Sequence, residues 1–472
     1  MANNIEAIYA LTPMQEGMYY YEKLNGEKNG EYFLQGTLKL QGEIQIEHAK
    51  ESVALLGLRH EVLRTAVVMP KKGLKPWQLI IKNRELETRE LDLSMLSQKE
   101  RERSLKALKE EDIKRGFQLE QDSLIRFRFV KMDNQCVYML WSMHHIIVDG
   151  WCLSLLLQDF SRFYSSLCQG VSKEELKREI ETECHSAAHY QEYINWLEES
   201  DKEAGMKYWN TLLDGFQEIT GIEPVYEKKE NFEKKVGELR FTFSEDVSNQ
   251  MTQFFKQHNL TGSHFFETAW SILLSRYNHM NDVVFGKVVS GRNVPIGGIE
   301  NTVGLFIHTI PVRIQLESNT TFLELARMLQ KQSAESLQYD TVSLADMQKQ
   351  CNNGNPLFDH IFAYENYYQG EEGAVGINNV DMEWVDYREQ TNYNLSLSVA
   401  EGKEFLLKFL YDPSIYEEKE LLLLARRIEQ LVKEVLVQEE IKWEELELLL
   451  PEEREKMKQW NQTAVPYEKE CT

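Results

Sequence analysis

The chain has 472 residues and a formal net charge of −23, because 53 Lys and Arg stand against 76 Asp and Glu. A protein this acidic repels phosphate backbones, so we expect no nucleic-acid partner. Hydrophobic residues make up 42% of the chain and charged residues 27%, which excludes the disordered and fibrous classes. The length suggests two or three units, each large enough to bury its own core.

No segment has the features of a membrane anchor or an export signal. The chain lacks a run of about 18 uncharged apolar residues, and residues 1–17 lack a basic region followed by an apolar one. The six cysteines include no C-x-x-C pair, whereas secreted chains commonly carry a disulfide framework. We therefore expect a monomeric, cytoplasmic protein with reduced thiols and no membrane contact.

The spacing of apolar residues predicts that strands and helices alternate in both halves of the chain. The predicted elements are a helix over 11–25, a strand over 32–40, a helix with the apolar face Ala49, Val53 and Leu56, a hairpin of strands over 124–132 and 136–142, a helix over 151–164, helices within 245–280, strands over 283–290 and 304–315, and a helix over 417–438. This pattern indicates a mixed α/β fold.

A charged segment over 171–185 offers the best boundary within the chain. We accordingly expect one unit over 1–180 and a second over 181–450. Residues 451–472 are polar and lack a strong apolar period, so we expect this tail to lie outside the core.

Several common catalytic patterns are absent from the sequence. It contains no G-x-x-x-x-G-K-[ST] and no G-x-G-x-x-G, so neither ATP nor a dinucleotide is indicated. A G-x-S-x-G elbow is missing, and His60-Glu61 lacks the second histidine of a zincin helix. Hydrolases with these signatures are thereby excluded.

The strongest candidate site is the run from His144 to Gly150, between a predicted strand and a Leu-rich helix. Neighbouring side chains on extended backbone point to opposite faces, so one histidine can face a cleft while the other packs behind it. His145 could accept a proton or hold a nucleophile, and Asp149 could orient it or pair with a distant Arg. From these residues alone a packing role stays open, and Gly150 could simply serve the turn. A metal site is a further alternative, but the two histidines do not easily converge and no third ligand is evident.

Residues 144–150 (HHIIVDG) resemble the H-H-x-x-x-D-G motif of the condensation domains of nonribosomal peptide synthetases. Further segments resemble the same family in the same order, namely 11–18 (LTPMQEGM), 59–65 (RHEVLRT), 190–196 (YQEYINW), 303–309 (VGLFIHT) and 355–360 (NPLFDH). The resemblance covers roughly residues 8–450.

This resemblance implies an α/β fold of two chloramphenicol-acetyltransferase-like lobes, arranged in a V with a tunnel at their junction. Donor and acceptor peptidyl carrier proteins would approach from opposite ends, each bringing a 4′-phosphopantetheine arm. The acceptor amine would attack the donor thioester, and the product would be an amide on the acceptor carrier. The chain itself would bind no metal and no cofactor. The tail over 451–472 resembles a linker toward an adenylation domain, which would be a further partner.

The same resemblance implies roles for single residues. His145 would be the active-site histidine and His144 its supporting neighbour. The other implied site residues are Asp149 as a structural ion-pair partner, Gly150 as a backbone element near the reacting groups, Trp151 as support, and Arg292 as the partner of the aspartate.

Two positions depart from the family pattern, since His308 stands where asparagine is common and Asn394 where aspartate is frequent. Arg59 and Arg64 are expected in salt bridges within the first lobe. Three related functions stay open: an epimerisation domain, which uses the same motif, a cyclising domain, and a docking module without chemistry. A cyclising domain would carry aspartate in place of His144.

Overall fold

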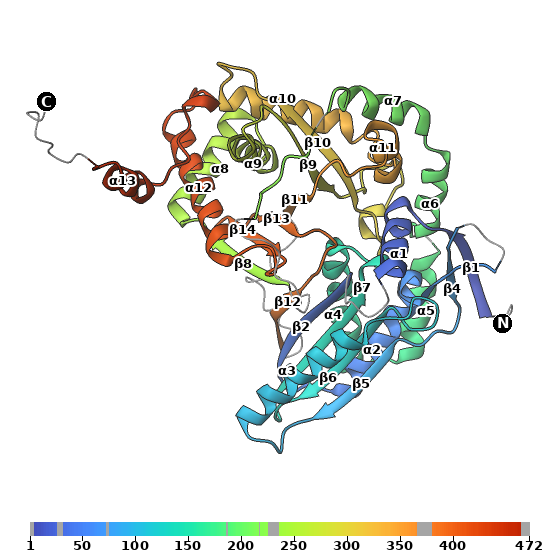
Figure 1. Cartoon of the computed structure of the whole chain (residues 1–472). Coiled ribbons are helices and arrows are strands. Elements are labelled where there is room, and N and C mark those ends of the chain that lie inside the picture. The colour runs from blue at the N-terminus through green and yellow to red at the C-terminus, as the bar shows by residue number, and fades with distance from the viewer. Residues whose placement is uncertain are drawn as a thin grey trace, which may run out of the picture.

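The computed structural model describes residues 4–25, 32–71, 75–185, 187–216, 218–224, 236–365 and 380–463, arranged as Figure 1 shows. The elements of the first half are β1 (Ile5–Ala10), α1 (Pro13–Asn25), β2 (Phe33–Gly42), α2 (Ile46–Arg59), β3 (Thr65–Val68), β4 (Trp77–Ile81), β5 (Glu87–Asp92), α3 (Gln98–Arg115), β6 (Ile125–Lys131), β7 (Cys136–His144), α4 (Gly150–Cys168), α5 (Lys173–Cys184), α6 (Tyr190–Glu199) and α7 (Lys202–Leu212). Those of the second half are β8 (Gly237–Thr242), α8 (Glu245–His258), α9 (Gly262–Asn278), β9 (Asp282–Val289), β10 (His308–Gln315), α10 (Phe322–Ser336), α11 (Leu344–Cys351), β11 (His360–Glu365), β12 (Val380–Arg388), β13 (Leu395–Ala400), β14 (Leu406–Tyr411), α12 (Glu418–Val437) and α13 (Pro451–Trp460).

The first large sheet has the strand order β12-β2-β7-β6-β5 and shares a core with α2, α4 and α5. The apolar stripe of α4, with Leu153, Leu156 and Phe160, belongs to the same buried cluster as the sheet residues Phe127 and Trp141. Burying side chains of this size contributes roughly 1.5–3 kcal/mol each. The start of α4, which carries the histidine motif, is therefore held by a large core.

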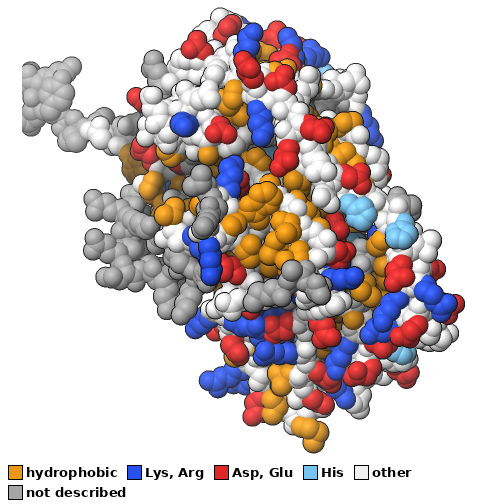
Figure 2. Space-filling model, turned by 90° about the vertical axis from the view of Figure 1, so that its right-hand side faces the viewer, with side chains coloured by type: hydrophobic (Ala, Val, Ile, Leu, Met, Phe, Trp, Pro, Cys, Tyr) orange, Lys and Arg blue, Asp and Glu red, His pale blue; other side chains and the backbone are white. Residues whose placement is uncertain are grey.

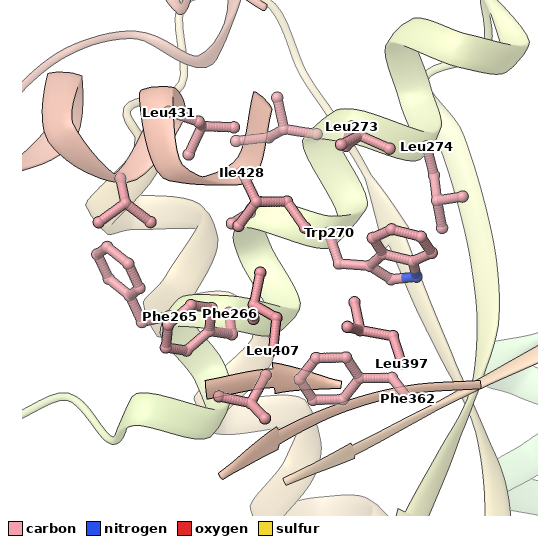
Figure 3. Close-up of a cluster of buried hydrophobic side chains, with 14 of the residues drawn as sticks. Phe265, Phe266, Trp270, Leu273, Leu274, Phe362, Leu397, Leu407, Ile428 and Leu431 are labelled. Atoms are coloured by element: carbon pink, nitrogen blue, oxygen red, sulfur yellow. The ribbon is translucent and has the colours of Figure 1, made fainter. Parts of the chain in front are cut away.

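The second large sheet has the order β10-β9-β11-β13-β14-β8 and lies under α8, α9, α10 and α12. Figure 3 shows Phe266 and Trp270 of α9 between the sheet residues Leu397 and Leu407 and the α12 residue Ile428. Helical spacing of apolar residues predicted α9 and α12, and this shared core is the reason for that spacing.

Two observations bear on the division expected at residues 171–185. This segment contains α5, whose Leu176 and Ile180 are buried in the first core. The strand β12, from the second half of the chain, pairs antiparallel with β2 and so completes the first sheet. We call each large sheet with the helices that cover it a body. A division into 1–180 and 181–450 separates β12 from the first sheet, which it completes.

The other predicted elements are present, with ends shifted by a few residues. The strand predicted over 304–315 begins only at His308, because the Phe306 N–H bonds the Asp149 carboxylate instead of a neighbouring strand. In the tail, α13 has no buried residue and stands away from both sheets in Figure 1. Residues 464–472 of the predicted tail lie outside the described residues.

The surface agrees with the composition. Figure 2 shows charged side chains of both signs over one face, with hydrophobic side chains gathered near its middle. In the part of the chain that the structure describes, no helix is long and apolar enough to cross a membrane.

Candidate active site

The histidine motif lies where β7 ends and α4 begins. His144 is the last residue of β7, His145 opens a short 3-10 turn, and Gly150 is the first residue of α4. The apolar side chains of residues 146–148 between them are fully buried. Close packing of this run fixes the turn and with it the direction of His145.

A cavity of about 770 Å³ lies beside the motif. His145 and Gly150 line it from the first body, and Thr309, Phe358 and Ser396 line it from the second. The histidine therefore faces a space that is enclosed by residues far along the chain.

A second cavity of about 1280 Å³ adjoins the first. The two share the lining residues Pro13, Glu16, Val342, Ser343 and Ala345, from the start of α1 and the chain around the start of α11. The second cavity thus lies between these shared residues and α7, which also lines it.

The His145 side chain is buried and lies against a carboxylate. Its Nε2 is 3.4 Å from Glu389 Oε1, and its backbone N–H donates to the Tyr32 carbonyl over 2.8 Å. Burial alone lowers the pKa of His145, but the contact with Glu389 and its negative charge outweigh burial, so the pKa is raised. Burial likewise raises the pKa of Glu389, and the contact with His145 outweighs it, so that pKa is lowered. The pair couples a basic imidazole to a carboxylate at the cavity wall.

His144 has different neighbours and does not line this cavity. Its Nδ1 accepts the Ile146 N–H over 3.0 Å, which places the proton of a neutral imidazole on Nε2. That Nε2 lies 3.2 Å from Glu22 Oε2, and the ring meets Phe117 edge-on. His144 therefore braces the turn that carries His145.

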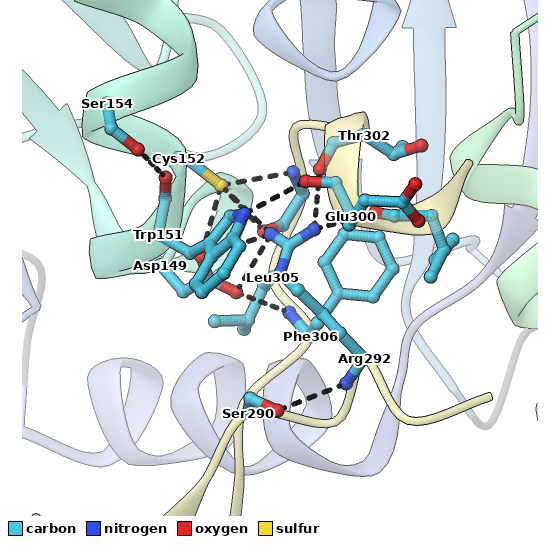
Figure 4. A network of polar contacts seen from close by, with 12 residues as sticks. Asp149, Trp151, Cys152, Ser154, Ser290, Arg292, Glu300, Thr302, Leu305 and Phe306 are labelled. Atoms are coloured by element: carbon cyan, nitrogen blue, oxygen red, sulfur yellow. Dashed lines mark hydrogen bonds and ion pairs between the residues drawn. The ribbon is translucent and has the colours of Figure 1, made fainter. Parts of the chain in front are cut away.

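Asp149 and Arg292 form a buried ion pair, which Figure 4 shows. Arg292 Nη2 lies 3.3 Å from Asp149 Oδ1, and the side chains are 6% and 1% exposed. Asp149 Oδ2 accepts the Phe306 N–H over 3.0 Å. Arg292 Nη1 donates to the carbonyls of Ile299 and Thr302 over 2.9 and 2.8 Å. This network ties the start of α4 to the chain that leads into β10.

Trp151 and Cys152 extend the network. Trp151 Nε1 donates to the Glu300 carbonyl over 2.9 Å, and Cys152 Sγ lies 3.1 Å from both Asp149 Oδ1 and the Gly304 carbonyl. Burial raises the pKa of the Cys152 thiol far above its usual value, so it stays protonated. These contacts join Asp149 to residues 300–304, ahead of β10, and none of them runs to His145.

His308 and Asn394, the two residues that depart from the family pattern, both line the cavity. His308 Nε2 is 2.7 Å from the Tyr193 hydroxyl, and burial lowers the pKa of His308 to about 4. This imidazole is therefore neutral and hydrogen-bonded to α6 at physiological pH. Asn394 lies immediately before β13.

Three polar side chains at the motif were missed from the sequence, namely Gln15, Glu22 and Glu389. Gln15 Nε2 donates to the Ile146 carbonyl over 2.8 Å. Gln15 and Glu22 are seven residues apart on α1, so they share one helix face, and that spacing was a usable signal. Glu389 follows β12 and reaches His145 only through the pairing of β12 with β2, which no local pattern reveals.

Arg59 and Arg64 form ion pairs within the first body, as predicted. Arg59 Nε lies 3.5 Å from Glu183 Oε2, and Arg64 Nη1 lies 2.6 Å from Glu6 Oε2. Neither arginine lines the two cavities. We therefore assign both to the support of the fold.

The chemistry available at the site follows from these groups. Among the described residues, no three His, Cys, Asp or Glu side chains are placed to share a metal ion. What the cavity wall offers is one buried imidazole whose basicity a carboxylate increases. Such a group can accept a proton from a nucleophile that is bound in the cavity.

The comparisons with known proteins agree on one family. The Condensation domain family matches residues 5–458. Surfactin synthase subunit 3 of Bacillus subtilis (strain 168) is 34% identical over 439 residues, which cover 92% of this chain and 33% of the subunit. The chain thus spans about a third of that relative and a smaller share of other synthase subunits that it matches.

Two solved structures show the same fold. A four-domain nonribosomal peptide synthetase bound to AMP and glycine matches with a TM-score of 0.76 and 17% identity, over 95% of this chain and 34% of that one. The complex of the X-domain and OxyB from teicoplanin biosynthesis matches with a TM-score of 0.77 and 16% identity, over 93% of this chain and 96% of that one. With the family match over nearly the whole length and the histidine motif at the cavity, the chain belongs to the condensation domains of nonribosomal peptide synthetases.

Proposed function

We propose that this domain is an acyltransferase that forms an amide between a donor acyl thioester and an acceptor aminoacyl thioester. Both substrates would be held on the phosphopantetheine arms of carrier proteins. The observation that carries the proposal is the His145 imidazole, paired with Glu389, on the wall of a cavity enclosed by two bodies. Membership of the condensation-domain family supports it.

In the proposed reaction the acceptor amine attacks the carbonyl carbon of the donor thioester. The new C–N bond forms, the C–S bond breaks, the nitrogen loses a proton and the sulfur gains one. Neutral His145 accepts the proton from the amine, and Glu389 stabilises the imidazolium that results. The imidazolium then gives the proton to the departing sulfur, which regenerates the neutral imidazole. General-base help of this kind adds on the order of 10²–10⁴-fold.

Positioning contributes more than proton transfer. Holding two reactants together can give effective molarities of about 10⁵–10⁸ M, which is roughly 7–11 kcal/mol of the barrier. Asp149 and Arg292 serve this purpose, because their ion pair fixes the start of α4 beside the cavity. His144 serves it too, by bracing the turn from behind.

The two adjoining cavities fit the arms that such substrates need. A phosphopantetheine arm is a flexible chain with amide groups, and the first cavity mixes apolar walls such as Val288 and Phe358 with hydroxyl groups such as Thr309. The second cavity extends this space past Glu16 and Ser343. We propose that the two lobes form a V whose tunnel consists of these spaces, with one arm entering from each end.

The wider setting is also part of the proposal. The domain would act as a monomer within a longer cytoplasmic synthetase, with donor and acceptor peptidyl carrier proteins as partners. An adenylation domain would follow the tail that contains α13. The greater length of the surfactin synthase subunit supports this setting.

The experiment mixes the purified domain with a donor carrier and an acceptor carrier, each loaded with an aminoacyl thioester, and follows both by intact mass spectrometry. The proposal requires that the acceptor carrier gain the mass of the donor acyl residue. An unchanged mass, with inverted stereochemistry when the residue is released from its carrier and separated by chiral chromatography, would instead identify epimerisation. Carrier binding without any product would identify a docking module.

A further inference from the structure

The sheet strands β11, β13 and β14 present polar side chains to the cavity beside apolar ones such as Ile361 and Leu410. Along β13, Leu395, Leu397 and Val399 belong to the core of the second body. Ser396 and Ser398, which alternate with them, line the cavity, and Leu397 also reaches it. Alternating side chains on a strand point to opposite faces, so the two serines share the cavity face. Ala363 on β11, which pairs with Ser398, also lines the cavity.

An ion pair stands in this face. Lys408 on β14 pairs in register with Ser398, and its Nζ lies 3.6 Å from Glu365 Oε2 at the end of β11. The two side chains are 13% and 12% exposed, and both line the cavity. Burial raises the pKa of Glu365, while the charge of Lys408 opposes that rise.

The ion pair is costly where it stands. Removing two charges from water costs several kcal/mol per ion, and apolar residues of similar size often stabilise a fold better. The opposite face of the same strands is apolar, so this sheet does not need the pair for its core. The free-energy cost of burying a polar side chain in a cavity wall is smaller when a bound substrate makes hydrogen bonds with it.

The charges of the cavity wall point to a neutral substrate group. The other acidic side chains that line it lie against basic ones, with Glu16 near Lys75, Asp359 near His360, and Glu389 near His145. A cationic substrate group would meet the ammonium of Lys408, and an anionic one would meet the carboxylate of Glu365. A primary carboxamide has a carbonyl oxygen for the ammonium and N–H groups for the carboxylate, so it fits both.

We infer that the polar wall, defined as Glu365, Ser396, Ser398 and Lys408, binds a neutral hydrogen-bonding side chain of one substrate, above all a primary carboxamide. This inference rests on the proposed amide-forming function. The side chain can belong to the donor acyl group or to the acceptor amino acid, and the experiment separates the two.

The test measures single-turnover rate constants of amide formation in two arms. In the first arm the donor carrier bears a glutaminyl, glutamyl, lysyl or leucyl residue, and the acceptor carrier bears alanine. In the second arm the same four residues are on the acceptor carrier, and the donor carrier bears alanine. Sites that hydrogen-bond a substrate group reject analogues that lack it. We expect glutamine to react at least about tenfold faster than the other three in one arm, which identifies the substrate that the polar wall contacts.

Two matched double variants test whether the preference for glutamine depends on the polar wall. In the double variant Lys408→Leu with Glu365→Leu, neither charge is left unpaired, and the ratio of glutaminyl to leucyl rates falls to about one. The control is Lys331→Leu with Glu335→Leu, an exposed pair on α10 at 4.0 Å, which keeps the wild-type ratio. If circular dichroism shows that the double variant does not fold, the wild-type rates with the four side chains still test the inference.

Two results have different meanings. Equal rates for all four side chains in both arms, with amide formed in each, would overturn the polar wall and leave the proposed function intact. A complete absence of amide in every reaction would overturn the proposed function, and the inference would fall with it.

Discussion

Replacing Asp149 by asparagine tests whether this carboxylate acts through the fold. The change keeps the size of the side chain and its ability to accept the Phe306 N–H, but it removes the charge that faces Arg292. Breaking one partner of a buried ion pair costs about 3–5 kcal/mol. Arg292 retains its bonds to the carbonyls of Ile299 and Thr302, so we expect the lower end, about 3 kcal/mol. At roughly 2–4 °C per kcal/mol for a unit of 150–250 residues, the melting temperature falls by about 6–12 °C.

The assay is thermal and urea unfolding of wild type and variant, followed by amide formation at a temperature where both are folded. The matched control is Asp133→Asn in the turn between β6 and β7, where the carboxylate is 53% exposed and lies 4.0 Å from Arg101. Such surface pairs contribute about 0–1 kcal/mol, so the control keeps the wild-type melting temperature. An Asp149→Asn protein with unchanged stability and lost activity would refute the structural role and place the carboxylate in the chemistry.

Three further predictions concern other parts of the account. Glu389→Gln shifts the acidic limb of the pH–rate profile to lower pH, because the charge that raises the pKa of His145 is gone and burial, which lowers that pKa, remains. An unmoved limb would contradict the pairing of His145 with Glu389. The control is Glu383→Gln, at an exposed residue. Gly36→Ala lowers the free energy of unfolding in urea by about 1–3 kcal/mol and speeds hydrogen exchange in β12, because the added Cβ would overlap the Trp384 ring. The control is Gly402→Ala, whose Cβ has room. Equal exchange in both variants would contradict the pairing of β12 with β2. Dialysis against a chelator leaves the rate unchanged, and a rate lost on chelation and restored by zinc would revive a metal role for the motif.

Single helices and strands could be predicted because the residues that recur with the apolar period in the sequence are the residues that are buried in the structure. In α12, Leu421, Leu424, Ile428 and Leu431 recur at helical spacing, and all four are buried in one core. The motif could be found for a similar reason, since its residues are contiguous in sequence and the strand, turn and helix that carry them are local structures.

The remaining features depend on contacts between distant segments. The pairing of β12 with β2 brings Glu389 to His145, and neither strand carries a sign of its partner. The boundary expected at 171–185 was drawn from charge, which does not show that β12, far along the chain, pairs with β2. Leu176 and Ile180, four residues apart and both buried in the first core, lie within the unit expected over 1–180.

The most direct test of the account is the single-turnover rate of amide formation by His145→Ala, measured by the mass of the acceptor carrier. If the imidazole accepts the proton of the amine, the rate falls by about 10²–10⁴-fold while circular dichroism and carrier binding stay unchanged. His185→Ala, at an exposed histidine, keeps the wild-type rate as the control. Amide formation by His145→Ala at the wild-type rate would contradict the central claim that this histidine carries out the chemistry of the cavity.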